Sequence, residues 1–539
     1  MRYLLALVFA LGTLSLQAQS EKALCAPPVD KASPSLPAKL MTGMGDVHMK
    51  ITTKSEEAQK FFDQGLAQMH SFWAREAERS FLQAAALDPE APMPWWGVAM
   101  VAVGDFRPQF QVEANEEVGG KYTNTNPRVK NAVERMLKLA EPAGRATGLE
   151  KLYMRAVALR RDIKAKNSTA DYLNALRELV QQHPKELEAR LYIALQAMRG
   201  YDLPAKTPRE GTMEAVHLLK QLYTEAPNHP GVPHFIIHAW EGSTFAADAE
   251  APARHYATLA PEIPHALHMP GHIFSQTGKW MEAAKYFALC QRKEIEYMTA
   301  DQLYGNGHHG HNTAYLATTY AFHGDVEKAI EIVNGLYEYK QSPREQEQLD
   351  AYTSAYRLAQ FTMIRTLVQH ERWDAILEGQ LIPAIEKPRP RAWRHWAMAL
   401  AHLAKGHLDE AEAERKLMDQ AVEDLTKMSF DKEVPELKTA QLELKGHQQI
   451  AQGKLDLGFK TLQQASQREV RQRYYEPPWY PRPVAEALGW AAIRHGRFPD
   501  AKRAFAVALE QYPESARSLA GRKEIDRLKA AGAAASAAQ

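Results

Sequence analysis

The sequence contains very little cysteine. Its 539 residues include only two cysteines, Cys25 and Cys290, which is too few for a disulfide framework. No CxxCH motif occurs, so the sequence excludes a covalently attached c-type haem. An exported protein could join the two cysteines in a disulfide. The favoured interpretation is instead that Cys25 lies in a flexible linker and that Cys290 packs as a small apolar side chain.

An excess of one charge sign is also missing. The chain carries 66 Lys and Arg residues against 65 Asp and Glu residues. Nucleic-acid-binding proteins normally show a basic excess, so we expect no nucleic-acid partner. After the N-terminus, no apolar run reaches the roughly 18 residues of a membrane helix. We therefore expect no membrane span in the mature protein.

The two ends of the chain differ from its body. The first 20 residues, "MRYLLALVFALGTLSLQAQS", combine an early arginine, an apolar stretch and small residues near Ala18–Ser20, a pattern typical of a cleaved signal peptide. This predicts a protein exported to the periplasm or secreted. Residues 21–50 are rich in Pro and Ala and predict a linker. Residues 523–539 are rich in Ala and predict a disordered tail.

Between these ends, helical patterning is continuous and strand signals are nearly absent. "FFDQGLAQMHSFWAREAERSFLQAAALDP" and "LGWAAIRHGRFPDAKRAFAVALEQYP" place small residues, an aromatic residue and a terminal proline at matching intervals. These segments resemble the tetratricopeptide repeat, a helical hairpin of about 34 residues. The resemblance implies an all-α fold, a right-handed α-solenoid of about ten helical hairpins over residues 51–522.

The histidines are concentrated in one part of this array. The chain has 21 of them, and ten lie between His229 and His311. In tetratricopeptide repeats, the second, fifth, ninth and twelfth positions of the first helix line the concave groove. The resemblance places seven side chains of segment 228–323 on such positions: His234, His238, Glu241, His265, His268, His272 and His311.

Several segments also resemble a group of histidine-rich bacterial tetratricopeptide proteins that have no established activity. The segments are "HFIIHAWE", "HMPGHIF" and "HNTAYLA", and the last one departs from the group, which often has a second histidine where this chain has Ala314. This resemblance implies the fold but no function.

Imidazole and carboxylate groups on facing helices are a common way to bind a metal ion. The seven groove residues are therefore predicted metal ligands, with zinc or copper as the metals that suit imidazole. Glu241 could act as a general base toward metal-bound water, which would make the protein a hydrolase. The alternative is a periplasmic scaffold whose groove binds a protein or peptide partner without metal.

Other features leave more than one interpretation open. Pro270 is expected to sit inside the helix that carries His268 and His272 and to remove a backbone hydrogen bond there, so that His265 and His268 could lie in a kinked turn. His70 is interpreted as an ordinary structural histidine, and the roles of His308 and His309 stay open. The segment "YYEPPWYP" (474–481) reads as a rigid connector or as a lid that brings Glu476 to the groove.

Overall fold

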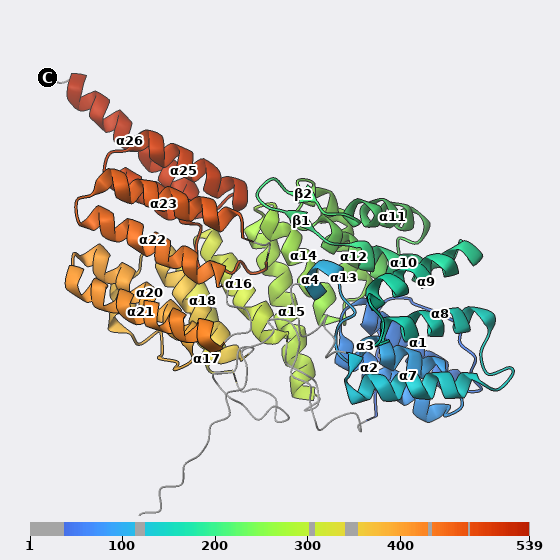
Figure 1. Ribbon diagram of the computed structural model, residues 1–539. Coiled ribbons are helices and arrows are strands. Elements are labelled where there is room, and N and C mark those ends of the chain that lie inside the picture. The colour runs from blue at the N-terminus through green and yellow to red at the C-terminus, as the bar shows by residue number, and fades with distance from the viewer. Residues whose placement is uncertain are drawn as a thin grey trace, which may run out of the picture.

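A computed structural model describes residues 37–113, 124–300, 308–339, 354–428, 434–472 and 475–537. These residues form consecutive pairs of helices (Figure 1). The prediction of an all-α helical repeat is confirmed. Eleven helical pairs lie within the described residues, close to the expected ten. One final helix packs against the last pair.

The N-terminal half of the solenoid contains five of these pairs. They are α1 (Glu56–His70) with α2 (Ala74–Leu87), α3 (Met93–Val101) with α7 (Pro127–Ala140), α8 (Gly148–Arg160) with α9 (Ser168–Gln182), α10 (Leu187–Ala197) with α11 (Thr212–Glu225), and α12 (Gly231–Trp240) with α13 (Glu250–Leu259). Three smaller elements interrupt the pairs: α4 (Gln109–Glu113), the 3-10 turn η1 (Ala246–Ala249), and a two-stranded antiparallel ribbon of β1 (Tyr201–Asp202) and β2 (Thr207–Pro208).

The remaining pairs continue from the middle of the molecule to its C-terminal end (Figure 1). They are α14 (Pro264–Gln276) with α15 (Trp280–Ala300), α16 (His309–His323) with α17 (Val326–Tyr337), α18 (Ala355–Gln369) with α19 (Trp373–Glu378), α20 (Pro388–Lys405) with α21 (Leu408–Met428), α22 (Pro435–Ala451) with α23 (Leu455–Val470), and α24 (Val484–Arg494) with α25 (Phe498–Gln511). Helix α26 (Ala516–Ala537) follows.

The glycine-to-aromatic spacing of the sequence explains the close packing inside a pair. A Cβ atom on Gly65 would lie 2.6 Å from the ring of Phe81, 16 residues later in the next helix. The same spacing brings Gly489 against Phe505, where a Cβ atom would lie 2.7 Å from the ring. Glycine is required in the first helix because any larger residue would overlap the aromatic ring.

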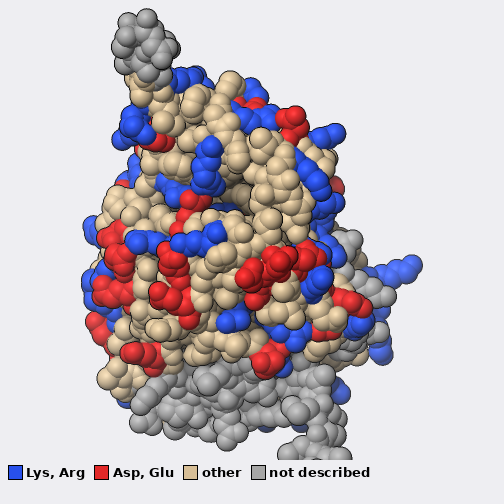
Figure 2. All heavy atoms as spheres, turned by 90° about the vertical axis from the view of Figure 1, so that its left-hand side faces the viewer, with Lys and Arg blue, Asp and Glu red and all other residues tan. Residues whose placement is uncertain are grey.

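The solenoid buries one large apolar core in each half. The N-terminal core runs from Ala38 to Ile273, and the C-terminal core from Ala314 to Val484. On the face that carries the last repeats, basic and acidic side chains are interspersed without a field of one sign (Figure 2). No helix within the described ranges is both long and apolar enough to cross a bilayer.

One buried ion group fixes the loop after α3 in place. The carboxylate of Asp105 accepts hydrogen bonds from Arg160 at 3.1 Å and from Arg161 at 2.5 and 2.8 Å. All three side chains are buried. Burial by itself would raise the pKa of Asp105, but the two guanidinium groups lower it to about 2. The loop is thereby held against the end of α8.

The predicted linker 21–50 is partly wrong. Residues 37–50, here called the N-terminal strap, pack on the solenoid with Met44, Val47 and Met49 buried. The backbone N–H of Glu262 donates to the carbonyl oxygen of Gly43 at 3.0 Å. The apolar side chains of the strap explain this packing, because their burial removes them from water. The predicted signal peptide and Cys25 lie outside the described residues.

The predicted disordered tail 523–539 is also wrong over most of its length. Residues 523–537 belong to helix α26. Ile525 is buried beside Phe505, and Leu528 packs on the same cluster. Alanine has the highest helix propensity of all residues, so an alanine-rich segment continues a helix once its first turns are packed.

Candidate metal centre

The seven predicted groove residues come together in space. They lie on α12, α14 and α16, the first helices of three consecutive pairs, and at the C-terminal end of α12. Their side chains form two groups of three histidines with Glu241 between them. Within each group, one ligand atom per histidine lies within 4.8 Å of the other two. We call His234, His238 and His265 the first triad, and His268, His272 and His311 the second triad.

In the first triad, each Nδ1 atom has a hydrogen-bond partner. Nδ1 of His234 donates to the backbone carbonyl oxygen of His70. Nδ1 of His238 donates to Oε1 of Glu241 at 2.7 Å. Nδ1 of His265 lies 3.4 Å from Nε2 of His308. A carbonyl or carboxylate oxygen can only accept, so His234 and His238 carry their protons on Nδ1.

The opposite nitrogens of the first triad have no partner. Among the described residues, no hydrogen-bonding group contacts Nε2 of His234, His238 or His265, and all three atoms are buried. A buried polar atom without a partner costs about 1–3 kcal/mol. Burial, together with the neighbouring imidazoles, lowers the pKa values of His234 and His265 well below the usual range. Three imidazoles thus lie close together, each with a buried Nε2 atom that has no hydrogen-bond partner among the described residues, which fits the ligand set of a transition-metal cation.

Phe72 forms the wall beside the first triad. Its ring centroid lies 4.4 Å from that of His234, 5.2 Å from His238 and 5.7 Å from His265. The guanidinium of Arg107 lies 5.5 Å from the same ring. The backbone of Phe72 has φ = 54°, a left-handed conformation that costs a bulky residue about 1–3 kcal/mol. Strain of this kind persists only where the surrounding packing enforces it.

Glu241 has a different position from the one expected. It is the residue after the last turn of α12, with an extended backbone (φ −60°, ψ 139°) that turns its side chain back toward the helix. Oε1 accepts from His238, and Oε2 accepts from Nδ1 of His272 at 3.1 Å. Burial would raise the pKa of Glu241, but the two histidines lower it to about 2. Glu241 thus orients a histidine of each triad, whereas the sequence suggested a ligand or a general base.

The second triad is also held by its surroundings. Nδ1 of His268 donates to Oδ1 of Asn312 at 2.8 Å, and the Asn312 amide donates to the carbonyl of Phe287 at 2.9 Å. Nε2 of His268 lies 2.7 Å from Nε2 of His272. The ring of His311 completes the group, with its centroid 5.0 Å from that of His268.

Glu476 is a member of the site that the sequence only suggested. It lies in the loop between α23 and α24, and it forms an ion pair with His272. Its Oε1 accepts from the Gln276 side chain at 3.0 Å. Burial would lower the pKa of His272, but Glu476 and Glu241 raise it to about 10. Glu476 of the segment "YYEPPWYP" therefore lies against the second triad.

A third buried cluster adjoins the first triad. Glu188 accepts from Nε2 of His70 at 2.7 Å and from Nε2 of His229 at 3.0 Å. Sequence reasoning missed Glu188 and His229, and it treated His70 as isolated. The only sequence feature that could have linked His70 to the site was its groove-facing position in its repeat. Both oxygens of Glu188 accept from imidazoles, so this cluster is a hydrogen-bonded support whose His70 carbonyl orients His234.

The loop before α16 supports the first triad from the other side. Nδ1 of His308 donates to Oε1 of Glu294 at 2.8 Å, and His309 also contacts Glu294 at 3.3 Å. Because the Nδ1–H of His308 donates to Glu294, its Nε2 carries a lone pair and can accept a hydrogen bond from Nδ1 of His265. The open question about these two histidines is answered by position: they lie at the site rather than in solvent.

Pro270 lies inside its helix, as expected, and does not interrupt it. Helix α14 is continuous from Pro264 to Gln276 and contains Pro270. The proline still lacks an N–H donor, which costs about 3 kcal/mol in a helix interior. Helices α12, α13 and α15 pack around α14, and their contacts offset that cost. His265, His268 and His272 therefore stay on one helix.

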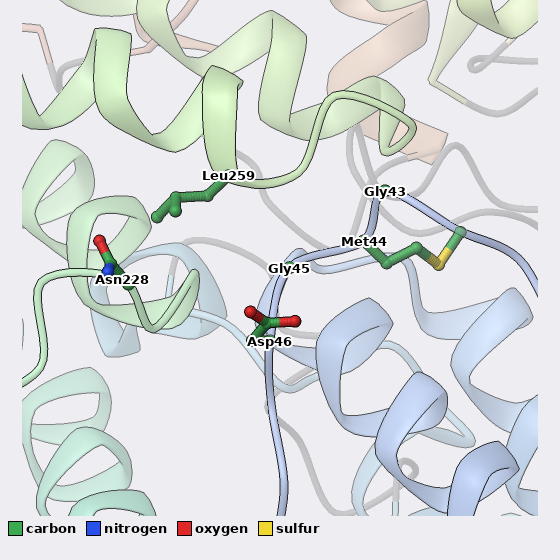
Figure 3. A pocket seen from close by; sticks show the side chains of 6 residues that line it. All are labelled: Gly43, Met44, Gly45, Asp46, Asn228 and Leu259. Carbon is green, nitrogen blue, oxygen red and sulfur yellow. The ribbon is translucent and has the colours of Figure 1, made fainter.

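A separate surface pocket of about 310 Å³ lies beside the N-terminal strap. Figure 3 shows Gly43 to Asp46 of the strap on one side and Asn228 and Leu259 on the other. No histidine lines it, so it is distinct from the two triads. Cys290 is buried, as the sequence suggested, and it forms no disulfide within the described residues; burial raises the pKa of its thiol.

Comparison with known proteins adds information about the fold alone. No family model and no curated protein sequence matches the chain. Solved structures that are similar include yeast Tom70 (12% identity, 88% of this chain and 96% of that chain covered, TM-score 0.35). Others are the Cut9–Hcn1 hetero-tetramer of APC/C (11%, 87% and 76%, 0.35) and the TPR domain of P58(IPK) (11%, 88% and 99%, 0.23). The helical hairpins described above, with a glycine packed against an aromatic ring 16 residues later, have the close packing that the sequence motifs predicted.

Proposed function

We propose that this solenoid of tetratricopeptide-like hairpins binds a transition-metal ion through His234, His238 and His265. One observation carries the proposal: three histidines from two helices bring ligand nitrogens within 4.8 Å of one another, and their buried Nε2 atoms have no partner among the described residues. The opposite nitrogen of each ring is held by a carbonyl, a carboxylate or another imidazole. Metal-binding histidines in proteins usually have their second nitrogen held in this way.

Zinc and copper suit this ligand set best. Both bind imidazole nitrogen readily, and three histidines are a known set for zinc. His234 and His238 are buried, and a closed site favours a retained ion over one that turns over substrate. Both Glu241 oxygens already accept from imidazole N–H groups. These observations support metal binding over metal-dependent hydrolysis.

A scaffold without metal is the alternative. Helical-repeat solenoids are suited to protein interaction, and such a role needs no ion in the groove. The two functions differ in a measurable way. A scaffold keeps its stability in the presence of a chelator, whereas a metal-binding centre loses the stabilisation that the ion provides.

The test is the metal content of the mature protein, purified without a histidine tag. We expect a stoichiometric ion in the parent and its loss in His234→Ala/His238→Ala. The matched control is His183→Ala/His217→Ala, which removes two exposed histidines and should keep the ion. Zinc at about 100 times its Kd should also stabilise the parent by about 2.7 kcal/mol. Equal metal content in both double variants would refute the proposal.

We also propose export, on the basis of residues 1–20 alone. Removal of the signal peptide would expose a new N-terminus close to Ala18–Ser20. N-terminal sequencing of protein from the periplasm or medium tests this. An intact Met1 in cell-associated protein would contradict it.

A further inference from the structure

We propose that the groove binds a second metal ion, held by His268, His272 and His311 beside the first. The inference rests on the proposed function in one respect, namely that imidazoles of this groove bind a transition metal. Its ligands are otherwise separate, because no residue belongs to both triads. The neighbouring rings of the two triads, His265 and His268, have centroids 5.8 Å apart.

The orientation of His268 is set independently of any ion. The Asn312 amide nitrogen donates to the Phe287 carbonyl, so its Oδ1 must face His268. An amide oxygen only accepts, and the proton of His268 therefore sits on Nδ1. Nε2 of His268 therefore accepts from the Nε2–H of His272, 2.7 Å away, and a metal ion bound between the two rings would replace that proton.

The charge around His272 favours a cation. Glu241 and Glu476 both face its Nδ1, one from the end of α12 and the other from the loop before α24. Both carboxylates are buried. Buried carboxylates are costly unless cations lie near them. A divalent ion on Nε2 of His272 would take the place of the proton on that atom and keep a positive charge beside the carboxylates, which hold the ring oriented, as in carboxylate–histidine–metal arrangements.

Another ligand set could compete for His268. His268, Cys290 and His308 also have ligand atoms within 4.8 Å of one another. In that set Nδ1 of His308 is the atom nearest to Cys290, at 3.9 Å, and the same atom donates to Glu294 at 2.8 Å. His308 would have to give up its carboxylate partner to bind an ion there. We therefore assign the second ion to His268, His272 and His311.

The test counts ions per chain after saturation with zinc and removal of excess metal. We expect two ions in the parent and one in His268→Gln/His311→Gln. We also expect one ion in the first-triad variant His234→Ala/His238→Ala, and two in Cys290→Ala. A second-triad variant that binds as many ions as the parent, or loss of an ion in Cys290→Ala, would overturn the proposal.

The two proposals fail in different ways. If the first-triad variant binds as many ions as the parent and the second-triad variant binds fewer, the proposed function is wrong but the second site remains. A measurement on the parent alone avoids variants that do not fold. Loaded with Cu²⁺, two neighbouring ions give an electron paramagnetic resonance spectrum broadened by their mutual coupling. The uncoupled spectrum of isolated Cu²⁺ at full loading would overturn the second site.

Discussion

Replacing Glu241 by glutamine separates an orienting role from a ligand or base. The carboxylate accepts from His238 Nδ1 at 2.7 Å with one oxygen and from His272 Nδ1 at 3.1 Å with the other. Glutamine has nearly the same shape but offers only one acceptor. The amide oxygen can accept from one imidazole N–H, but the amide NH2 group faces the other imidazole N–H and cannot accept from it. One of the two hydrogen bonds is therefore lost.

The expected size of the effect follows from this loss. Removing the partner that orients a metal-binding histidine typically lowers metal affinity about 10- to 100-fold, or about 1.4–2.7 kcal/mol. The ion stays bound at saturating metal because all three Nε2 ligands of the first triad remain. If Glu241 were itself a ligand, the site would lose a donor atom. A general base, by contrast, could be replaced without any change in affinity.

The assay is a titration of metal-free protein against a coloured chelator of known affinity. The control is Glu210→Gln, an exposed glutamate, which should bind like the parent. Affinity equal to that of the parent in Glu241→Gln would refute the orienting role. Complete loss of the ion at saturating metal would show that Glu241 is a ligand.

Three further predictions concern stability. Asp105→Asn leaves two buried guanidiniums without their carboxylate, and denaturant unfolding should show a loss of about 3–5 kcal/mol; a loss below about 1 kcal/mol would contradict this. Burial raises the pKa of Glu469 to about 8, above its value of about 4.3 in unfolded chains. The folded state then binds the extra proton, so this residue makes stability fall as pH rises from about 4.3 to 8. Glu469→Gln should flatten this part of a pH series of melting temperatures, and an unchanged slope would exclude the effect. Gly271→Ala places a Cβ atom 2.4 Å from Phe287 and should cost about 1–3 kcal/mol. In α17, Gly335→Ala meets no atom within 4 Å and should be neutral or stabilising by up to about 1 kcal/mol. Equal effects of the two alanines would contradict this packing.

The repeat and the positions of the histidines could be predicted from the sequence because both depend on local spacing. Gly65 and Phe81 lie 16 residues apart, and one hairpin is enough to bring them into contact. His234 and His238 lie one helical turn apart, so they share a face of α12 in any packing. The repeat period then carries that face to the same side of the solenoid as His268 and His272.

The partners of these histidines could not be predicted from local spacing. The His70 carbonyl reaches His234 across 164 residues of sequence, and Glu476 reaches Gln276 across 200. Such contacts depend on the small rotation between neighbouring repeats, which accumulates along the solenoid and is not recorded in any single repeat.

For Glu241, local spacing predicted one feature and the folded chain set another. Its spacing from His238 predicted proximity, but the end of α12 at Trp240 decided that its side chain turns back onto two imidazoles. Local spacing is enough to assign the imidazoles to their helices and to one side of those helices. Which nitrogen of each ring is hydrogen-bonded depends on the folded chain, because most of the acceptors come from residues far away in the sequence.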